Sequence, residues 1–314
     1  MNGGTQKKAI IIGASEEALH TIEKAHENGL FVTALDGNPA ASGLAAADKA
    51  LVVDISDERA TIEAVRKEDP DFVLTVPIGR YLTTIGMVND TLQLPGISRE
   101  MAEKCTDKWL FHETLVQKGL RNCHCYPAGK IKEKRDTGSV TFREEIPEDK
   151  LTFPAILKPR FGSGSRGIHM LFSKEDLERG LSEIGEEDYI LEECIAGEEY
   201  GIDGAVIGGK FHLILLRKKK NTPFPARQAV AYFSILPEDP FYGQAREYME
   251  AVIEAMELDE CLLHADLIQG ENGPFVIELS ARPSGHNLHN LFTPLCTGID
   301  EAEEYIRYLS LIHI

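Results

Sequence analysis

The sequence of 314 residues has no run that approaches the roughly 20 consecutive apolar residues of a membrane span. Its N-terminal apolar stretch, residues 9–12, is too short for a signal peptide. Cationic residues are also scarce, because 33 Lys and Arg oppose 51 Asp and Glu, for a formal net charge of −18. This acidity argues against a duplex nucleic-acid partner and means that any anionic ligand needs a local cluster of cations. We therefore expect a soluble, cytoplasmic protein with no nucleic-acid or membrane partner.

Cysteine is sparse, and several enzyme motifs are missing. The six cysteines show no disulfide-framework spacing, so reduced thiols are expected. The dinucleotide fingerprint G-x-G-x-x-G is absent, because Gly13 is followed by Ala14, Ser15 and Glu16. The P-loop pattern G-x-x-x-x-G-K-[ST] does not occur either. The two commonest sequence signatures of nucleotide binding are thus excluded.

Strand and helix patterns alternate over the first 97 residues, which predicts a parallel sheet with crossover helices. Ser98 is the predicted N-cap of one helix over residues 98–113. From residue 153 onward, strand-like segments follow one another closely, which is typical of an antiparallel-rich α+β fold. The predicted strands of the first part are residues 9–12, 30–35, 50–53, 72–76 and 95–97. The fold class is therefore an α/β parallel-sheet domain followed by an α+β part, with a boundary near residues 98–105.

A cationic, glycine-rich segment follows the predicted strand that ends at Lys158. Glycines allow close backbone approach, so N–H groups and hydroxyls of such a loop can point at phosphate oxygens. Arg160 and Arg166 add positive charge. A plain hairpin turn is the alternative, but three cations in so acidic a chain favour phosphate binding. The small residues of the loop are Gly162, Ser163, Gly164, Ser165 and Gly167.

Carboxylates gather in the next segment. A predicted strand ends at Glu192 and Glu193, a glycine turn follows, and the returning strand carries Glu199 and Asp203 on one face. Clustered acids are costly unless donors meet them, and ribose hydroxyls, an amino group or a metal would serve. From these residues alone, a polar hairpin that faces water is an equally good interpretation.

A third segment reads as a hairpin with an Asn-Gly turn and one carboxylate on each strand, Asp266 and Glu278. Folding brings the two carboxylates side by side, where they can hold Mg²⁺ against nucleotide phosphates. Arg282 follows, in position to face a phosphoryl group. Hard oxygen ligands favour magnesium over zinc. The competing zinc site would use His264, His286 and His289.

Taken in this order, the three segments resemble the ATP-grasp superfamily over nearly the whole chain. The similarity is greatest to the group with biotin carboxylase, the carbamoyl-phosphate synthase large chain, D-alanine–D-alanine ligase and the L-amino-acid ligases. The resemblance implies a Rossmann-like pre-ATP-grasp domain over residues 1–97 and an ATP-grasp domain over residues 98–314, with a small subdomain at about residues 125–195. Members of the family usually continue further, so we expect a chain truncated at its C-terminus.

The resemblance also assigns nucleotide contacts. Lys108, which follows Asp107, matches the lysine that reaches the ATP phosphates, and Lys158 matches the strand lysine that contacts the nucleotide. Residues 162–167 match the loop that closes over the phosphates. The hinge that reads adenine, partly through its backbone, falls on Glu192, Glu193 and Ile195. The acid that binds the ribose falls on Glu199.

The metal ligands implied by the resemblance are Asp266 and Glu278, with Ser280 in place of the family's usual Asn. A hydroxyl is a weaker Mg²⁺ ligand than an amide oxygen, so the second metal is expected to be held less firmly. Arg217 and the lysine run at residues 218–220 fall where, in the family, the chain approaches the carboxylate substrate, and we interpret the lysine run as a solvated strand end. The predicted catalytic cations are Arg166, Arg227 and Arg282.

The implied reaction has two steps. A substrate carboxylate attacks the γ-phosphate of ATP, giving an acyl phosphate and ADP, and an amine, thiol or other nucleophile then displaces phosphate. ATP with Mg²⁺, or Mn²⁺ in its place, is the implied cofactor; a small carboxylate and a small amine are the substrates, and a homodimer is expected. Two alternatives on the same fold are a non-catalytic ATP sensor and a carbamoyl-phosphate-type phosphotransferase.

Overall fold

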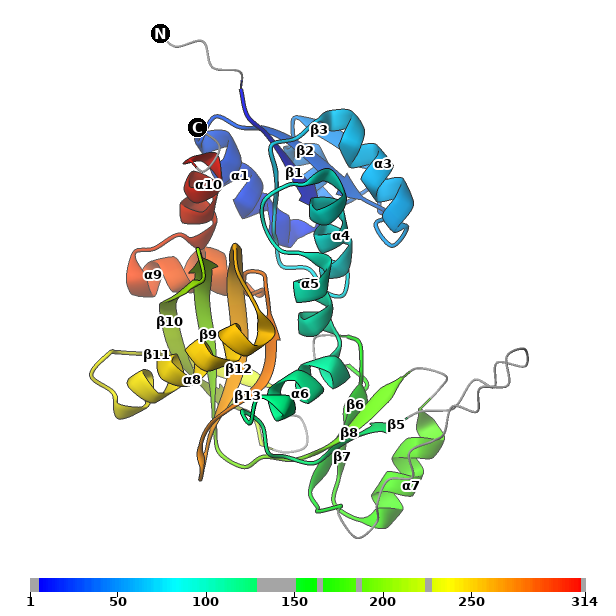
Figure 1. Cartoon of the computed structure of the whole chain (residues 1–314), viewed down its shortest axis with the longest axis vertical. Coiled ribbons are helices and arrows are strands. Elements are labelled where there is room, and N and C mark those ends of the chain that lie inside the picture. The colour runs from blue at the N-terminus through cyan, green and yellow to red at the C-terminus, as the bar shows by residue number, and fades with distance from the viewer. Residues whose placement is uncertain (1–5, 129–150, 163–165, 185–187, 224–227, 312–314) are drawn as a thin grey trace.

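The computed structural model describes residues 6–128, 151–162, 166–184, 188–223 and 228–311. Its strands form three sheets (Figure 1). Within these described residues, no helix combines the length and the apolar character needed to cross a bilayer. The part of the predicted site that lies outside the described residues is Ser163, Gly164, Ser165 and Arg227.

The N-terminal sheet is wholly parallel, with the strand order β3-β2-β1-β4. Ile10, Ile11 and Ile12 of its central strand are fully buried, because helices cover both faces of the sheet. The α/β prediction is confirmed for this part of the chain. The strands are β1 (Lys8–Ile12), β2 (Phe31–Asp36), β3 (Lys49–Val52) and β4 (Phe72–Leu74).

The helices around this sheet begin where the sequence provides caps. The Asp57 side chain accepts a hydrogen bond from the N–H of Ala60 at the start of α3, and Ser98 accepts one from Met101 at the start of α5. A 3-10 turn (Glu16–Ala18) leads into α1. The helices are α1 (Leu19–Glu27), α2 (Ser42–Ala46), α3 (Glu58–Glu68), α4 (Leu82–Leu92), α5 (Arg99–Thr106) and α6 (Lys108–Gln117).

Two local predictions were wrong in this region. The single helix expected over residues 98–113 is two helices, because Asp107 has extended backbone angles and its side chain accepts from the N–H groups of Trp109 and Leu110. Asp107 therefore ends α5 and caps α6. Residues 95–97 form no strand; the polypeptide there turns at Gly96, whose φ is +118°.

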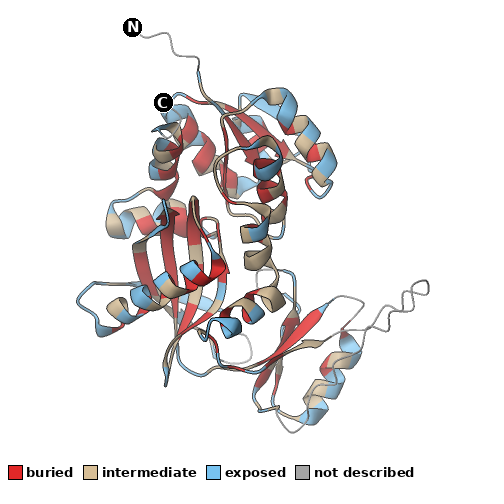
Figure 2. Ribbon diagram, viewed as in Figure 1, coloured by how far each residue is buried: buried red, intermediate tan, exposed pale blue. Residues whose placement is uncertain are grey.

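The largest sheet has five antiparallel strands in the order β11-β10-β9-β12-β13. One face packs on α8 (Pro240–Met256), and buried side chains such as Leu267, Val276 and Met249 join one core that continues into the N-terminal part (Figure 2). The opposite face of the central strands is polar. The strands are β9 (Glu198–Ile207), β10 (Lys210–Asn221), β11 (Ala229–Ile235), β12 (Cys261–Gly270) and β13 (Gly273–Ser280).

The third sheet, β5-β8-β6-β7, is antiparallel and has a small core of its own with Leu157, Leu191 and Ile184. Helix α7 (Lys174–Glu183) packs on it (Figure 1). The sequence patterns did not predict β5, which pairs with β8 more than sixty positions later. The strands are β5 (Cys125–Ala128), β6 (Ala155–Pro159), β7 (His169–Leu171) and β8 (Tyr189–Glu193).

The last elements return to the N-terminal domain. A π-helical turn (Leu288–Phe292) and α9 (Thr293–Thr297) lead to α10 (Glu301–Leu311), which lies beside α1 in Figure 1. Ile306 and Leu309 of α10 share a core with Ile22 of α1. The domain limits at residue 97 and at about 125 and 195, and the C-terminal truncation, stay predictions.

Candidate functional site

A β-bulge aims the carboxylate of Glu278 at the polar face of the large sheet. Leu267 pairs with Val276 and Asp266 pairs with Glu278, so Ile277 is the extra residue between them. Without the bulge, Glu278 would share the core face with Val276, two positions earlier. With it, Asp266 and Glu278 are direct cross-strand neighbours, whose Cβ atoms lie about 5 Å apart in such pairs. The predicted pairing of the two carboxylates is confirmed.

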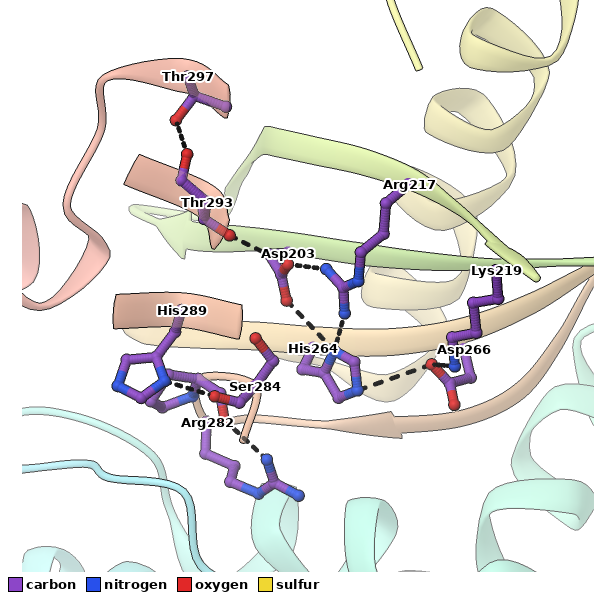
Figure 3. Close-up of polar contacts among 11 residues, drawn as sticks. Asp203, Arg217, Lys219, His264, Asp266, Arg282, Ser284, His289, Thr293 and Thr297 are labelled. Carbon is purple, nitrogen blue, oxygen red and sulfur yellow. Dashed lines mark hydrogen bonds and ion pairs between the residues drawn. The ribbon is translucent and has the colours of Figure 1, made fainter. Parts of the chain in front are cut away.

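The same face holds a buried charge network around Arg217 (Figure 3). Arg217 and Asp203 are both fully buried and form an ion pair. Arg217 Nη2 lies 3.3 Å from His264 Nδ1, and Asp203 Oδ1 lies 3.2 Å from the same nitrogen. Burial lowers the pKa of His264, so the imidazole is neutral at neutral pH. The groups that meet the buried carboxylate of Asp203 are thus side chains of the protein itself.

Gly201 makes room for this guanidinium. Arg217, Gly201 and Asp266 stand in one row across three strands. A Cβ atom at Gly201 would lie 2.9 Å from the guanidinium carbon of Arg217. The arginine therefore lies flat over the glycine and reaches Asp203 and His264 on the neighbouring positions.

Lys219 reaches Asp266 from the same edge of the network. Its Nζ lies 2.5 Å from Asp266 Oδ1, and His264 Nε2 lies 3.6 Å from the same oxygen. Burial acts to raise the pKa of Asp266, but Lys219 and the neighbouring cations outweigh it, so the pKa is lowered and the carboxylate is charged. The prediction that the lysine run at residues 218–220 is a solvated strand end was wrong for Lys219, because Lys219 faces this network.

In the small sheet, Glu192 organises two cations. Its carboxylate is buried, 2.7 Å from Arg121 Nη2 and 3.2 Å from Lys158 Nζ. Burial acts to raise the pKa of Glu192, and Lys158 and Arg121 lower it further than burial raises it. The Glu192 side chain therefore holds Lys158 in place, and its backbone pairs with β5 and β6 inside the small sheet.

Lys108 links the small sheet to the carboxylate hairpin. At the first position of α6, its Nζ donates to the backbone oxygen of Gly162, at 2.8 Å. Burial lowers the pKa of Lys108, while the nearby Glu278 raises it and Lys158 lowers it. Lys108 therefore lies close enough to both Glu278 and Lys158 to interact with their charges. One pocket of about 50 Å³ is lined by Lys108 and Gly162 together with Glu278, Ser280 and Arg282.

Arg160 does not contribute to that pocket in the way the sequence suggested. Its guanidinium binds Asp107 through two hydrogen bonds, Nε to Oδ1 at 2.7 Å and Nη2 to Oδ2 at 2.6 Å. The backbone N–H of Lys108 also donates to the Arg160 carbonyl, at 3.2 Å. Arg160 thus fixes the loop of the small sheet to the start of α6, instead of adding free charge for a phosphate.

The other hinge residues are partly engaged with the protein. Glu193 accepts hydrogen bonds from the His124 N–H and the Thr152 hydroxyl, and Glu199 accepts one from the Asn221 amide. Ile195 is half-buried and approaches Gly270 at the tip of the β12–β13 hairpin. Their roles toward adenine and ribose stay predictions.

The structure does not bring every predicted residue together. Arg166 and Gly167 are exposed next to the small sheet, and neither lines the pocket that holds Glu278. Arg282 is largely buried beside that pocket, and its Nη1 donates to the Pro283 carbonyl at 2.7 Å. The charge of Glu278 opposes the effect of burial on the pKa of Arg282, so the two groups lie close together.

The zinc alternative finds no support in the described part of the chain, where no three His, Cys, Asp or Glu side chains are grouped to hold a metal ion. His264 belongs to the Arg217 network. His289 is buried, with its Nδ1 2.5 Å from the Ser284 carbonyl oxygen and its ring edge-on to His20.

Sequence reasoning missed Arg121, Asp203 as the partner of Arg217, and Lys219 as the partner of Asp266. For Arg217 and Lys219 a signal was present, since residues two apart on a strand share a face, and Asp266 and Asp203 were expected near the same sheet. For Arg121 there was none, because it meets Glu192 from a loop seventy-one positions away.

Residues 151–289 match the family model described as "ATP-grasp domain". This stretch is therefore an ATP-grasp domain, and the chain has the ATP-grasp fold that the sequence predicted. Among curated proteins, the chain is similar to an L-arginine-specific L-amino acid ligase of Bacillus subtilis, at 26% identity over 76% of this chain and 58% of that one. It is also similar to dapdiamide A synthase of Enterobacter agglomerans, at 22% identity over 63% of this chain and 47% of that one. The chain spans about half the length of the curated relatives it matches.

Solved structures show the same fold. An L-amino acid ligase from Bacillus licheniformis superposes with a TM-score of 0.80 at 20% identity, over 97% of this chain and 74% of that one. An ADP complex of N5-carboxyaminoimidazole synthetase from Staphylococcus aureus superposes with a TM-score of 0.71 at 18% identity, over 90% of this chain and 72% of that one. A biotin carboxylase domain from Hydrogenobacter thermophilus, solved with MgADP, superposes with a TM-score of 0.72 at 17% identity, over 97% of this chain and 70% of that one.

Proposed function

We propose that the protein is an ATP-dependent ligase that activates a substrate carboxylate as an acyl phosphate for attack by an amine or another nucleophile. The observation that carries this proposal is the single pocket shared by Lys108 and Gly162 of one lobe and Glu278, Ser280 and Arg282 of the other. The cations Lys108 and Arg282 and the carboxylate of Glu278 meet there in a chain of net charge −18. Ligases among the similar proteins support the same reading.

The paired carboxylates fit a magnesium ion. Asp266 and Glu278 offer hard oxygen ligands on adjacent strands, and Glu278 is exposed toward the pocket. Asp266 is charged and holds Lys219 through Oδ1, so its second oxygen is the one we assign to the metal (Figure 3). When bound, Mg²⁺ would neutralise phosphate charge, and ATP would supply the transferable phosphoryl group. Ser280, the cross-strand neighbour of His264, is the proposed weaker third ligand.

The remaining residues would neutralise and align the phosphates. Lys108 and Arg282 line the pocket, and Lys158, held by Glu192, would add positive charge from the small sheet. A carboxylate oxygen of the substrate attacks the γ-phosphorus, the bond to the β-phosphate oxygen breaks, and ADP leaves. The amine then attacks the acyl carbon and phosphate departs, while the amine loses a proton to solvent. Positioning and charge neutralisation are the protein's contribution, and no side-chain nucleophile is required.

The roles of Arg166 and Arg227, the adenine and ribose contacts, and the homodimer are parts of this proposal. Small carboxylates and amines are the proposed substrates, since the similar L-arginine-specific L-amino acid ligase carries amino acids in its name.

We expect Glu278→Gln to abolish Mg²⁺-dependent ADP formation, because it removes one of two paired acidic ligands and leaves the fold intact. Glu271→Gln is the matched control, since Glu271 is exposed in the turn of the same hairpin. The measurement is ADP and phosphate release over a panel of amino acids and small acids, with mass spectrometry of the products. Full turnover in Glu278→Gln would overturn the metal assignment. ATP binding without turnover in the parent would favour the sensor, and a phosphorylated product without an amide would favour the phosphotransferase.

A further inference from the structure

A second and larger cavity opens next to the pocket already described. It measures about 460 Å³, within the roughly 300–1,000 Å³ that small-molecule sites occupy. Arg80 and Thr106 line both cavities, so the two are neighbours that share one wall. The larger cavity lies between the N-terminal ends of α3 and α4 and helices α5 and α6, and its other charged lining residues are Glu58, Arg99, Glu103 and Asp107.

Of the two arginines that line the larger cavity, Arg80 and Arg99, Arg80 is the one that carries no ion pair among the described residues. Arg99 is held by Glu58 at 3.0 Å and by Glu103 at 2.6 Å, and Asp107 is held by Arg160. The Arg80 guanidinium lies 5.3 Å from the centre of the Tyr81 ring and has no carboxylate partner in that part of the chain. In so acidic a protein, an exposed and unpaired arginine at a cavity wall is available for an anionic ligand.

The topology of the N-terminal sheet points to the same place. The chain runs from β1 to β2 and β3 on one side of β1 and then returns to place β4 on the other side, so the strand order reverses between β1 and β4. In open parallel sheets, the crevice at the carboxyl ends of such strands is where ligands bind. The loop that carries Arg80 follows the carboxyl end of β4, and Ile78 and Gly79 of this loop line the smaller pocket.

The larger cavity also has an apolar wall. Tyr81 and Leu110 line it, and Phe161 contributes a ring that is 44% exposed. These side chains come from three separate parts of the chain, and they surround space that a hydrocarbon or aromatic group can fill.

We propose that Arg80 binds the reacting carboxylate of the substrate at the wall between the two cavities, and that the larger cavity holds an apolar body attached to that carboxylate. The substrate class is a small carboxylic acid with an aromatic or branched aliphatic side chain. This inference rests on the proposed function, which gives the direction of the substrate carboxylate. The carboxylate points toward the adjoining pocket, because Glu278 and Arg282 lie there. The two arginines then approach the same reacting groups from opposite domains.

The binding test uses 3-phenylpropanoate as the probe, its amide as the uncharged analogue and acetate as the truncated one. Calorimetry is performed on the full chain with Mg²⁺ and a non-hydrolysable ATP analogue. We expect 3-phenylpropanoate to bind at least about tenfold more tightly than its amide, and Arg80→Gln to abolish that difference. Phe161→Ala should weaken 3-phenylpropanoate and leave acetate unchanged. Arg66→Gln, an exposed arginine on α3, is the control.

The kinetic test separates this inference from the proposed function. Arg80→Gln should raise the KM of the carboxylate at least about tenfold and leave the KM of ATP within about twofold. Arg80→Lys should restore part of the loss.

Turnover with an unchanged carboxylate KM in Arg80→Gln would overturn the Arg80 site while the ligase proposal stands. Arg80-dependent binding of 3-phenylpropanoate without any ADP formation would overturn the ligase proposal while the binding site stands. Equal binding of the acid and the amide, or no binding of either, would overturn the inference.

Discussion

Glu192 shows how a buried carboxylate can hold two cations in place. The hinge motif assigns it to adenine, but its carboxylate is buried between Arg121 and Lys158. Because both cations would be unpaired and buried without it, its loss would cost several kcal/mol of stability by analogy with other buried pairs, about 3–5 kcal/mol. The role of Glu192 toward adenine stays a prediction, and its distant partner Arg121 was not predictable from local sequence.

Glu301, the first residue of α10, makes stability depend on pH. It is fully buried, and burial raises its pKa from 4.5 to about 8. The folded chain thus keeps a proton that the unfolded chain releases, so stability falls as pH rises from about 4.5 to 8 and then levels off. We expect Glu301→Gln to increase the free energy of unfolding by roughly 2–4 kcal/mol above pH 8 and to change it little below pH 4.5.

Urea unfolding of both proteins across this pH range is the measurement. Glu304→Gln is the control, because Glu304 is exposed on the same helix. Parallel curves for the parent and Glu301→Gln would show that the buried carboxyl titrates normally.

At the scale of elements, the sequence predicted most strands and helices but not the irregularities that shape the site. The bulge at Ile277 turns Glu278 toward Asp266, against the alternation that its neighbours suggest. The break at Asp107 starts α6 at Lys108 and attaches it to Arg160. The bulge depends on the register within the hairpin, and the break at Asp107 on a cap and on the distant Arg160, none of which periodicity reveals.

Two helical glycines should respond in opposite ways to the same substitution. A Cβ at Gly86 in α4 would lie 2.5 Å from the Ser98 carbonyl oxygen, whereas nothing lies within 4 Å of one at Gly243 in α8. We expect Gly86→Ala to destabilise the protein by about 1–3 kcal/mol, because α4 must move away from the start of α5. Gly243→Ala should stabilise it by about 0.5–1 kcal/mol, because alanine loses less backbone entropy on folding. Chemical unfolding at one pH measures both, and a stabilising Gly86→Ala would contradict the close packing of these two helices.

At the scale of the whole molecule, two sheets and one pair of helices supply different parts of the proposed site. The small sheet provides Lys158 and the Gly162 loop, the large sheet provides Asp266 and Glu278, and the α5–α6 pair places Lys108 between them. The fold and the carboxylate pairing were predictable from motif order and hairpin geometry. The Arg217 network, Arg121 and the position of Arg80 were not, because each depends on how separate elements meet in space.

The most direct test of the account is equilibrium binding of ATP with and without Mg²⁺ to the parent, Lys108→Met and Glu278→Gln. If cations and paired acids share one nucleotide site, the parent should bind ATP more tightly when Mg²⁺ is present. Glu278→Gln should lose most of that dependence on Mg²⁺, and Lys108→Met should bind at least about tenfold more weakly in either condition. Retained Mg²⁺ dependence in Glu278→Gln together with parental affinity in Lys108→Met would contradict the shared site.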